Sequence, residues 1–548
     1  MSKNKIIAKN TILLYFRMLL TLGVTLYTSR IVLNTLGVVD FGIYNVVGGV
    51  VIMFSFLNSA MSSATQRFLS YEIGKNDYEQ LKKVFSMSVN IHVIIALIVI
   101  ILAETAGLWF LNTKLIIPLE RMEAANWVYQ FSILSFVLTM MGVPYNATII
   151  ANERMNVYAF VSVVEVALKL IVVFALVRFG YDKLKMYAIL ISCVSVIVWM
   201  TYKVYCKRNF PESNYRFFWE KSLYKTLMNY AGWNLFGNIA AIAMGQGVNI
   251  LLNLFFGPIV NSARGIAFQI NGAVSGFVIN FQMAMNPQII KSYAADDRKY
   301  MHQLIFQGSK YSFFLLFFIA LPIFMEAEII LRWWLKIVPE HTVLFCRLVL
   351  INTLIDCISG PLMTAAQATG KIKKYQAVVG GFLLLILPIS YVLLKKGFPP
   401  EITLYVSISV SIIALLARLF ILRPLLNLSI LKFTRTVLIP ILLVAVISVI
   451  FPLIVKYSVN QEFIQYLAIY FPLILKYNLN QELIQYLTVY FPLILKCNIN
   501  QELIQLFTVG IASILSVTIS IYLLGLRNEE QVFMKNKLRK FVFKTKER

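Results

Sequence analysis

Apolar runs alternate with short polar connections along the whole chain. A transmembrane helix needs about 20 predominantly apolar residues, so runs of this length predict membrane-spanning helices. The pattern therefore predicts an all-α polytopic membrane protein with about 14 transmembrane helices. The predicted spans are residues 11–33, 41–61, 84–110, 127–150, 157–177, 186–205, 230–256, 259–283, 311–334, 343–368, 377–394, 402–422, 437–455 and 507–524.

The composition strengthens this prediction. Hydrophobic residues make up 59% of the chain and charged residues only 14%, against about 25% charged in an ordinary soluble domain. The mean hydropathy is +0.75. The first apolar run is interrupted by Arg17 and Arg30 and has no small-residue cleavage site, so we expect a retained helix rather than a signal peptide.

The net charge of +25 suggests nucleic acid as a partner until the positions of the charges are considered. Basic residues gather on alternate connections, as the positive-inside rule predicts for cytoplasmic loops. Both termini are therefore predicted to be cytoplasmic, with the basic tail as a topology anchor and no nucleic acid as partner. These residues are Lys3, Lys5, Lys9, Lys75, Lys82, Lys83, Lys207, Arg208, Arg216, Lys221, Lys225, Lys291, Arg298, Lys299, Lys371, Lys373, Lys374 and the tail 527–548.

An internal repeat predicts two lobes. Residues 33–37 (LNTLG) resemble 252–257 (LNLFFG), and residues 66–71 (QRFLSY) resemble 288–293 (QIIKSY), each pair in corresponding spans. Lobes of six helices enter the membrane in the same direction, so their symmetry axis should lie along the membrane normal. The predicted organisation is an N-terminal lobe (1–206), a connection (207–226), a C-terminal lobe (227–424), spans 13 and 14 (425–526) and the tail (527–548).

Three tandem copies of a 20-residue unit fill residues 451–510. Each copy contains Lys, Asn, Gln and Glu, and its apolar run is too short to span comfortably. We expect an elongated, partly amphipathic outer connection, produced by a duplication that an exposed loop tolerates. A recognition arm is the alternative.

Span 259–283 is unusually polar and predicts a lumen. Its Arg and three polar residues, at offsets of 7, 11 and 18, form one stripe at about 100° per residue. A buried arginine needs water, a partner or an anion, and the alternative is interhelical hydrogen bonding. The candidates for substrate binding are Arg264, Asn271, Ser275 and Gln282, with Asn238 and Asn249 from the preceding span.

Other charged residues lie within the predicted spans. Arg17 and Arg30 are further candidates for substrate binding, although Arg30 lies near the outer end and could instead pair with Asp40 or extend to the interface. Glu165 and Lys169 form an i,i+4 pair, which indicates a neutralised structural pair or an ion relay. Those two residues and Asp356 are the candidates for ion coupling.

Enzyme signatures are missing from the sequence. It contains no P-loop, no HExxH motif and no Ser/His/Asp grouping, and the cysteines are scattered without metal-ligand spacing. We therefore expect neither catalysis, metal nor cofactor. A membrane glycosyltransferase or polymerase is a distant alternative.

Several motifs together resemble the O-antigen-type oligosaccharide flippases of bacterial polysaccharide synthesis. This resemblance implies the multidrug/oligosaccharidyl-lipid/polysaccharide exporter fold, with two six-helix lobes around a cavity and a C-terminal helix pair. The motifs are 27–37 (YTSRIVLNTLG), 40–48 (DFGIYNVVG), 66–70 (QRFLS), 143–147 (VPYNA), 151–155 (ANERM) and 366–371 (AQATGK).

The function implied by the resemblance is translocation of a polyprenyl-pyrophosphate-linked oligosaccharide to the outer leaflet of the bacterial cytoplasmic (inner) membrane, for O-antigen, capsule or exopolysaccharide synthesis. Cationic residues in the cavity would contact the substrate. Membrane lipids, a polysaccharide polymerase and chain-length machinery are the candidate partners. The alternative is a cation-coupled drug or metabolite antiporter of the same superfold.

The tandem units are predicted to be dispensable. Deleting residues 471–490 and 491–510 together leaves one unit between spans 13 and 14 and should preserve activity and a cytoplasmic C-terminal reporter. A single-unit deletion that moves the reporter to the outer side would show instead that each unit crosses the membrane.

Overall fold

Every regular element in the described part of the chain is a helix, which confirms the prediction of an all-α fold. Most of the tandem units (459–500) and most of the basic tail lie outside that part. The computed structural model describes residues 3–52, 54–113, 115, 117–178, 182–256, 258–335, 338–458, 501–526 and 530–531.

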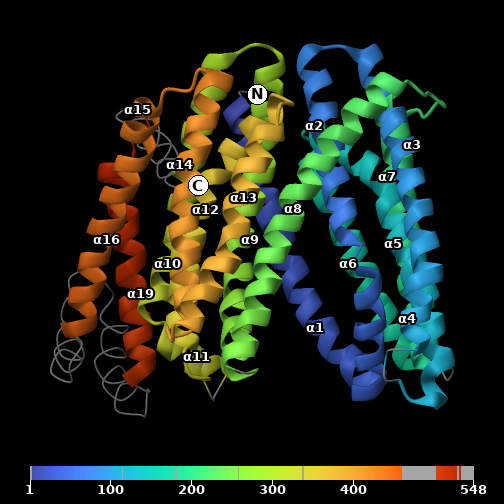
Figure 1. Ribbon diagram of the computed structural model, residues 1–548, viewed down its shortest axis with the longest axis horizontal. Helices are drawn as coiled ribbons and strands as arrows, with labels where there is room; N and C mark the ends of the chain where they lie inside the picture. The colour runs from blue at the N-terminus through green and yellow to red at the C-terminus, as the bar shows by residue number, and fades with distance from the viewer. Residues whose placement is uncertain are drawn as a thin grey trace, which may run out of the picture.

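Twelve helices in the described residues are long and apolar enough to cross a membrane. Two more polar helices, α2 (Ser55–Lys75) and α9 (Pro258–Ala294), run among them (Figure 1). The set agrees with the prediction of about 14 spans. The twelve are α1 (Lys3–Ile52), α3 (Tyr78–Leu102), α5 (Met122–Ala151), α6 (Met155–Arg178), α7 (Lys183–Asn209), α8 (Lys221–Phe256), α10 (Arg298–Met325), α12 (Thr342–Ala368), α13 (Lys373–Lys395), α14 (Ile402–Leu426), α16 (Ile439–Ser458) and α19 (Gln501–Ser520).

Helix α1 bends sharply at Gly37, where φ is 80° and ψ is 167°. This backbone conformation is open essentially to glycine, because a Cβ would clash there. The bend divides α1 into two limbs, so the first predicted span and the start of the second belong to one kinked helix. Gly37 ends the motif 27–37, and this conformation explains why that motif needs a glycine.

The helices form two groups with α1 and α8 running between them (Figure 1). One hydrophobic cluster joins α2, α3, α5 and α7 through residues such as Leu69 and Phe85. Another joins α9, α10, α12 and α14 through residues such as Ile305 and Phe345. Lipid tails are as apolar as these side chains, so close packing rather than exclusion of water holds the helices together. The lobe boundaries at 206, 227 and 424 stay predictions.

The C-terminal pair, α16 and α19, is attached to the second group by polar contacts. Lys456 donates to the carbonyl of Met325 at 2.7 Å and lies 3.1 Å from the carboxylate of Glu326. Gln505 donates to the same carboxylate at 3.1 Å. Glu326 is 1% exposed, and the cation and the amide make its burial tolerable. Both helices extend into the tandem units, over residues 451–458 and 501–510.

A three-residue ion cluster joins α1, the start of α5 and α7 at the end opposite the N-terminus. Arg121 donates to both carboxylate oxygens of Asp40 and, at 2.8 Å, to Asp182. Asp182 also caps α7 by accepting the amide hydrogens of Leu184 and Lys185. The sequence suggested Arg30 as a partner for Asp40. The partner in the structure is Arg121, which lies 81 positions from Asp40 in the chain.

We expect Arg121→Ala to lower the free energy of unfolding by about 1–2 kcal/mol at pH 7, because it leaves two partly buried carboxylates without their cation. Thermal unfolding in detergent measures this loss. Burial raises the pKa of Asp182, but the hydrogen bonds from Arg121 and from two amides outweigh it and leave the pKa lowered.

A lowered pKa means that this stabilisation is present above the unfolded-state pKa, about 3.9, and is lost as the pH falls through the folded-state value. The difference between wild type and Arg121→Ala should therefore shrink below about pH 4. Arg298→Ala is the matched control, since Arg298 pairs with the exposed Asp296. An equal loss in both variants would contradict the prediction.

Candidate functional site

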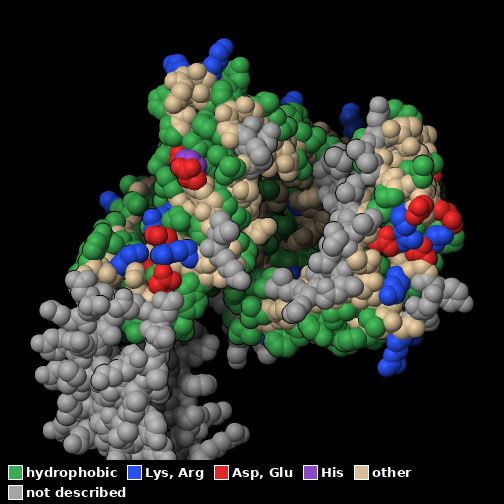
Figure 2. Space-filling view, turned by 90° about the horizontal axis from the view of Figure 1, so that it is seen from below, with side chains coloured by type: hydrophobic (Ala, Val, Ile, Leu, Met, Phe, Trp, Pro, Cys, Tyr) green, Lys and Arg blue, Asp and Glu red, His purple; other side chains and the backbone are tan. Residues whose placement is uncertain are grey.

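A hollow lies between the two helix groups. Figure 2 looks from the end opposite the N-terminus and shows the hollow opening toward that end. We call the other end the basic end; it carries the N-terminus and the turns after α2, α9 and α12. At the basic end the two groups touch, so the hollow is open at one end and closed at the other.

Arg67 makes the first contact across the basic end. It lies on α2, is 6% exposed, and donates to the backbone carbonyls of Gln367 at 3.1 Å and Ala368 at 2.8 Å. The last carbonyls of a helix lack helical partners and carry the negative end of its dipole. Gly370 follows with φ of 73°, and a Cβ there would lie 2.9 Å from the Arg67 guanidinium. Position 370 therefore requires glycine for two reasons: its φ is positive, and the Arg67 guanidinium leaves no room for a Cβ.

Glu153 makes the second contact. It lies in the turn after α5 with φ of 60°, and its carboxylate accepts hydrogen bonds from Lys291 and Gln288 on α9. Glu153 and Lys291 are only 10% and 19% exposed. A charged pair in so little water depends on these direct hydrogen bonds.

The two contacts are related by the internal repeat. Arg67 lies in segment 66–71, whereas Gln288 and Lys291 lie in the matching segment 288–293. Each segment binds the turn that follows a helix of the other group. We call Arg67, Glu153, Gln288, Lys291 and Gly370 the basic-end lock.

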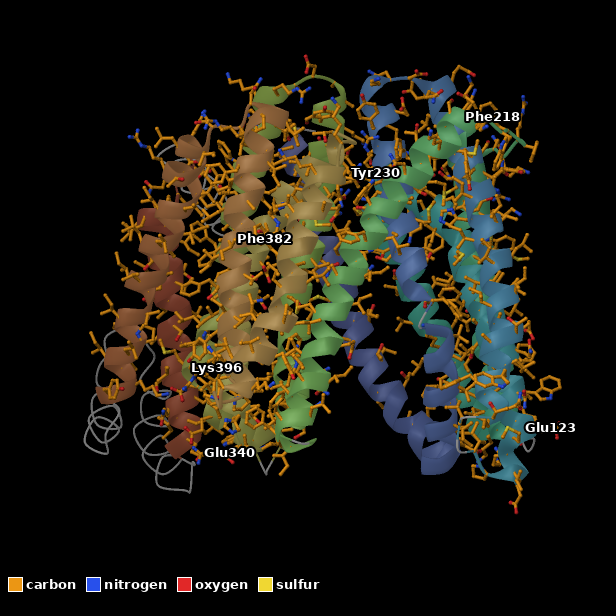
Figure 3. The ribbon with its side chains drawn as sticks, in the orientation of Figure 1. Glu123, Phe218, Tyr230, Glu340, Phe382 and Lys396 are labelled. Atoms are coloured by element: carbon orange, nitrogen blue, oxygen red, sulfur yellow. The ribbon has the colours of Figure 1, made fainter. Side chains whose placement is uncertain are left out.

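Close packing of α2 and α9 surrounds the lock. The rings of Tyr71 and Tyr293 lie 6.3 Å apart. A Cβ on Gly74 would lie 2.7 Å from the Cα of Lys291, so only glycine permits this approach. In Figure 3, Tyr230 marks where α8 passes beside α2, and its ring lies 5.4 Å from that of Phe68.

The sequence did not predict the lock as a site. Motifs 66–70, 151–155 and 366–371 supported the family resemblance without a role. The structure places 66–70 against 366–371 and places 151–155 against segment 288–293. The available signal was an arginine and a glutamate in short motifs at predicted helix ends.

The predicted stripe on α9 is engaged with neighbouring helices. Asn271 accepts a hydrogen bond from Thr353 on α12 at 2.6 Å. Gln282 donates to Ser312 on α10 and to the carbonyl of Cys357 on α12, each at 3.0 Å. Ser275 bonds only weakly to its own helix, at 3.4 Å. These contacts match the alternative of interhelical bonding, and a role in substrate binding stays a prediction.

Arg264 is 4% exposed. Its Nε donates to the side chain of Asn249 on α8 at 2.7 Å, and its guanidinium lies 4.4 Å from the ring centre of Phe268. Two predicted residues, Arg264 and Asn249, are thus direct partners. Asn238, on the same helix as Asn249, is half-buried.

Arg17 lies 4.6 Å from the ring centre of Tyr158. Its neighbour Met18 contacts Asn280, 16 positions beyond Arg264, which is about 24 Å along α9. The structure therefore does not bring Arg17 and Arg264 together. The side chain of Arg30 lies outside the described residues.

No described carboxylate lies within ion-pair distance of Arg17 or Arg264. A guanidinium in a membrane protein without an acidic partner is costly, and such residues mark water-filled cavities or anion sites. This lack of a counter-charge is the main electrostatic feature of the spans.

The ion-coupling candidates divide into two cases. Glu165 and Lys169 form an ion pair at 2.6 Å. Asp356 is exposed and accepts a hydrogen bond from Asn352 at 2.9 Å. Arg418, which was not among the predicted site residues, donates hydrogen bonds to Tyr375 and Ser359, each at 3.1 Å.

Among the described residues, no group of three or more His, Cys, Asp or Glu could hold a metal ion.

Comparison with known proteins supports the fold. No protein-family model and no curated protein matches the chain. The outward-facing conformation of a multidrug resistance MATE family transporter of the MOP superfamily aligns with a TM-score of 0.67 at 13% identity, covering 78% of this chain and 96% of that one. The Vibrio cholerae MATE transporter VcmN in the bent form aligns with a TM-score of 0.62 at 17% identity, covering 78% and 98%. The chain shares the fold of these proteins.

We expect Arg67→Ala to open the basic end. The variant removes hydrogen bonds from a charged donor, worth about 1.5–3 kcal/mol, so basic-end-open molecules should increase about tenfold or more. A Ser70→Cys reporter, 0% exposed as serine, should react faster with an impermeant maleimide. Lys299→Ala, an exposed change at the same end, is the control. Equal labelling in both variants would mean that Arg67 does not hold the lock.

Proposed function

We propose that the protein is a membrane transporter that works by alternating access between its two helix groups. The hollow that is open at one end and closed by the lock at the other supports this proposal. The shared fold, which includes an outward-facing transporter, also supports it. In such a cycle the lock would open while the opposite end closes.

The proposed substrate is a polyprenyl-pyrophosphate-linked oligosaccharide. Arg264 and Arg17 carry this proposal, because each is a guanidinium without a described acidic partner and its forked donors suit phosphate oxygens. The motif resemblance adds to it. Pyrophosphate would meet Arg264. Arg17, which lies far from Arg264 along α9, and Arg30 would meet acidic sugars or the pyrophosphate at another stage of the cycle, and sugar hydroxyls would meet Asn271, Ser275, Gln282, Asn238 and Asn249.

A cation-coupled drug or metabolite antiporter is the second candidate. The solved structures that share this fold are described as multidrug and MATE transporters, and this comparison favours the antiporter over the flippase. Asp356, exposed in α12, is the described acid best placed to exchange a cation, and Glu165 with Lys169 is the further candidate. Against it stands the excess of cations over carboxylates within the spans.

The proposed location is the bacterial cytoplasmic membrane, with the basic end and both termini in the cytoplasm. The positive-inside rule supports this orientation. The open hollow then faces outward, toward the leaflet that would receive the glycan. A polysaccharide polymerase and chain-length machinery are the proposed neighbours.

Transport in vesicles separates the two candidates. Purified protein is reconstituted and supplied in turn with fluorescent lipid-linked oligosaccharide and with a cationic dye under a proton or sodium gradient. The flippase proposal expects translocation of the lipid-linked sugar without dye movement. Gradient-dependent dye movement without sugar translocation would establish the antiporter instead.

We expect Arg264→Ala to lower translocation of the lipid-linked sugar at least about tenfold, since it removes a charged donor to phosphate. Arg264→Lys keeps the positive charge but loses the paired donors of the guanidinium, so it should retain partial activity. Arg178→Ala, an exposed change at the end of α6, is the control. Full translocation by Arg264→Ala would reject the assignment.

A further inference from the structure

A pocket of about 1160 Å³ opens at the basic end. Its walls come from α2, the start of α8, the turn between α12 and α13, and the end of α14. Small-molecule sites usually measure about 300–1,000 Å³, so the pocket has room for a ligand of ordinary size. None of the proposed substrate-binding residues lines it.

Four exposed lysines line this pocket: Lys225, Lys371, Lys373 and Lys374. None of them forms an ion pair with a carboxylate in the described part of the chain. Lys291 at the same end, by contrast, is neutralised by Glu153. The lysines of the pocket therefore concentrate uncompensated positive charge.

Two helix starts add to this charge. Helix α13 begins at Lys373 without a side-chain cap, and neither α13 nor α8 has an acidic residue in its first turn. Free N–H groups at a helix start bind anions. The nearby acids are Glu72, which lines the pocket, and Glu220, which accepts a hydrogen bond from Ser222.

Aromatic side chains also line the pocket. They are Phe68 and Tyr71 of α2 and Tyr230 and Trp233 of α8. The ammonium of Lys373 lies 5.5 Å from the ring centre of Trp233. A lining that contains both lysines and aromatic rings suits an amphipathic anion at the edge of a membrane.

We propose that this pocket binds a phosphate-bearing ligand and thereby favours the closed basic end. The phosphate comes from one of two sources, the headgroup of an anionic phospholipid or a soluble phosphate compound. The ligand contacts α2 of one helix group and the α12–α13 turn of the other, and these elements separate when the lock opens. A ligand that binds the closed form better shifts the population toward it.

The test uses the full chain with the Ser70→Cys reporter and two probes. One probe is dioleoylphosphatidylglycerol in phosphatidylcholine nanodiscs, and the other is sodium pyrophosphate added to protein in pure phosphatidylcholine nanodiscs. When the probe concentration is about ten times its Kd, the open form should be about tenfold less populated, and reporter labelling should slow about tenfold. The variant Lys225→Gln, Lys373→Gln, Lys374→Gln should lose this protection.

Two further variants make the outcome specific. Lys207→Gln, Lys299→Gln, Lys432→Gln removes the same charge from the same end outside the pocket and should keep the protection. The variant Lys225→Arg, Lys373→Arg, Lys374→Arg should also keep the protection. Protection by one probe alone identifies the source of the phosphate. No protection by either probe, or equal protection in both glutamine variants, overturns the proposal whatever the transported substrate is.

Discussion

The bond between Arg67 and the end of α12 is the contact on which the rest of the arrangement depends. A guanidinium on one helix group binds carbonyls at the end of a helix in the other group, where the usual helical donors run out. Breaking it leaves a buried cation and deprives the Ala368 carbonyl of this donor, while the Gln367 carbonyl keeps its hydrogen bond from the Gly370 amide. Lipid does not relieve the cost of a buried unpaired group. The closed basic end and the open hollow follow from this contact together with Glu153 and the glycine-permitted approach of α2 to α9.

Much of the fold could be predicted from the sequence because membrane helices are specified locally. The length of each apolar run fixes a span, so the fourteen predicted segments correspond to described helices. Helix α9 was predicted as a span, but the predicted span 41–61 covers the end of α1 and only residues 55–61 of α2. The rest of α2 is too polar to form an apolar run. The repeat also pointed to segments 66–71 and 288–293, which meet in the structure.

The candidate site was less predictable because periodicity shows which face of a helix is polar but not what that face meets. The stripe containing Asn271 and Gln282 was expected to line a lumen, yet both residues bond to α12. Arg121 binds Asp40 and Asp182, which lie 81 and 61 positions away. Arg67 finds its partners 300 positions away. Such distances in sequence carry no local signal, so only the fold reveals these pairs.

The two halves of the lock occupy equivalent places but differ in chemistry. Glu153 holds Lys291 by an ion pair between two side chains, whereas Arg67 holds backbone carbonyls, which every residue type provides. The Glu153 half is therefore lost when either of its two charged side chains is replaced. The Arg67 half keeps its acceptors whatever residue stands at position 367 or 368, because the main chain supplies them. Substitutions would thus weaken the two halves unequally, even though the halves occupy equivalent places.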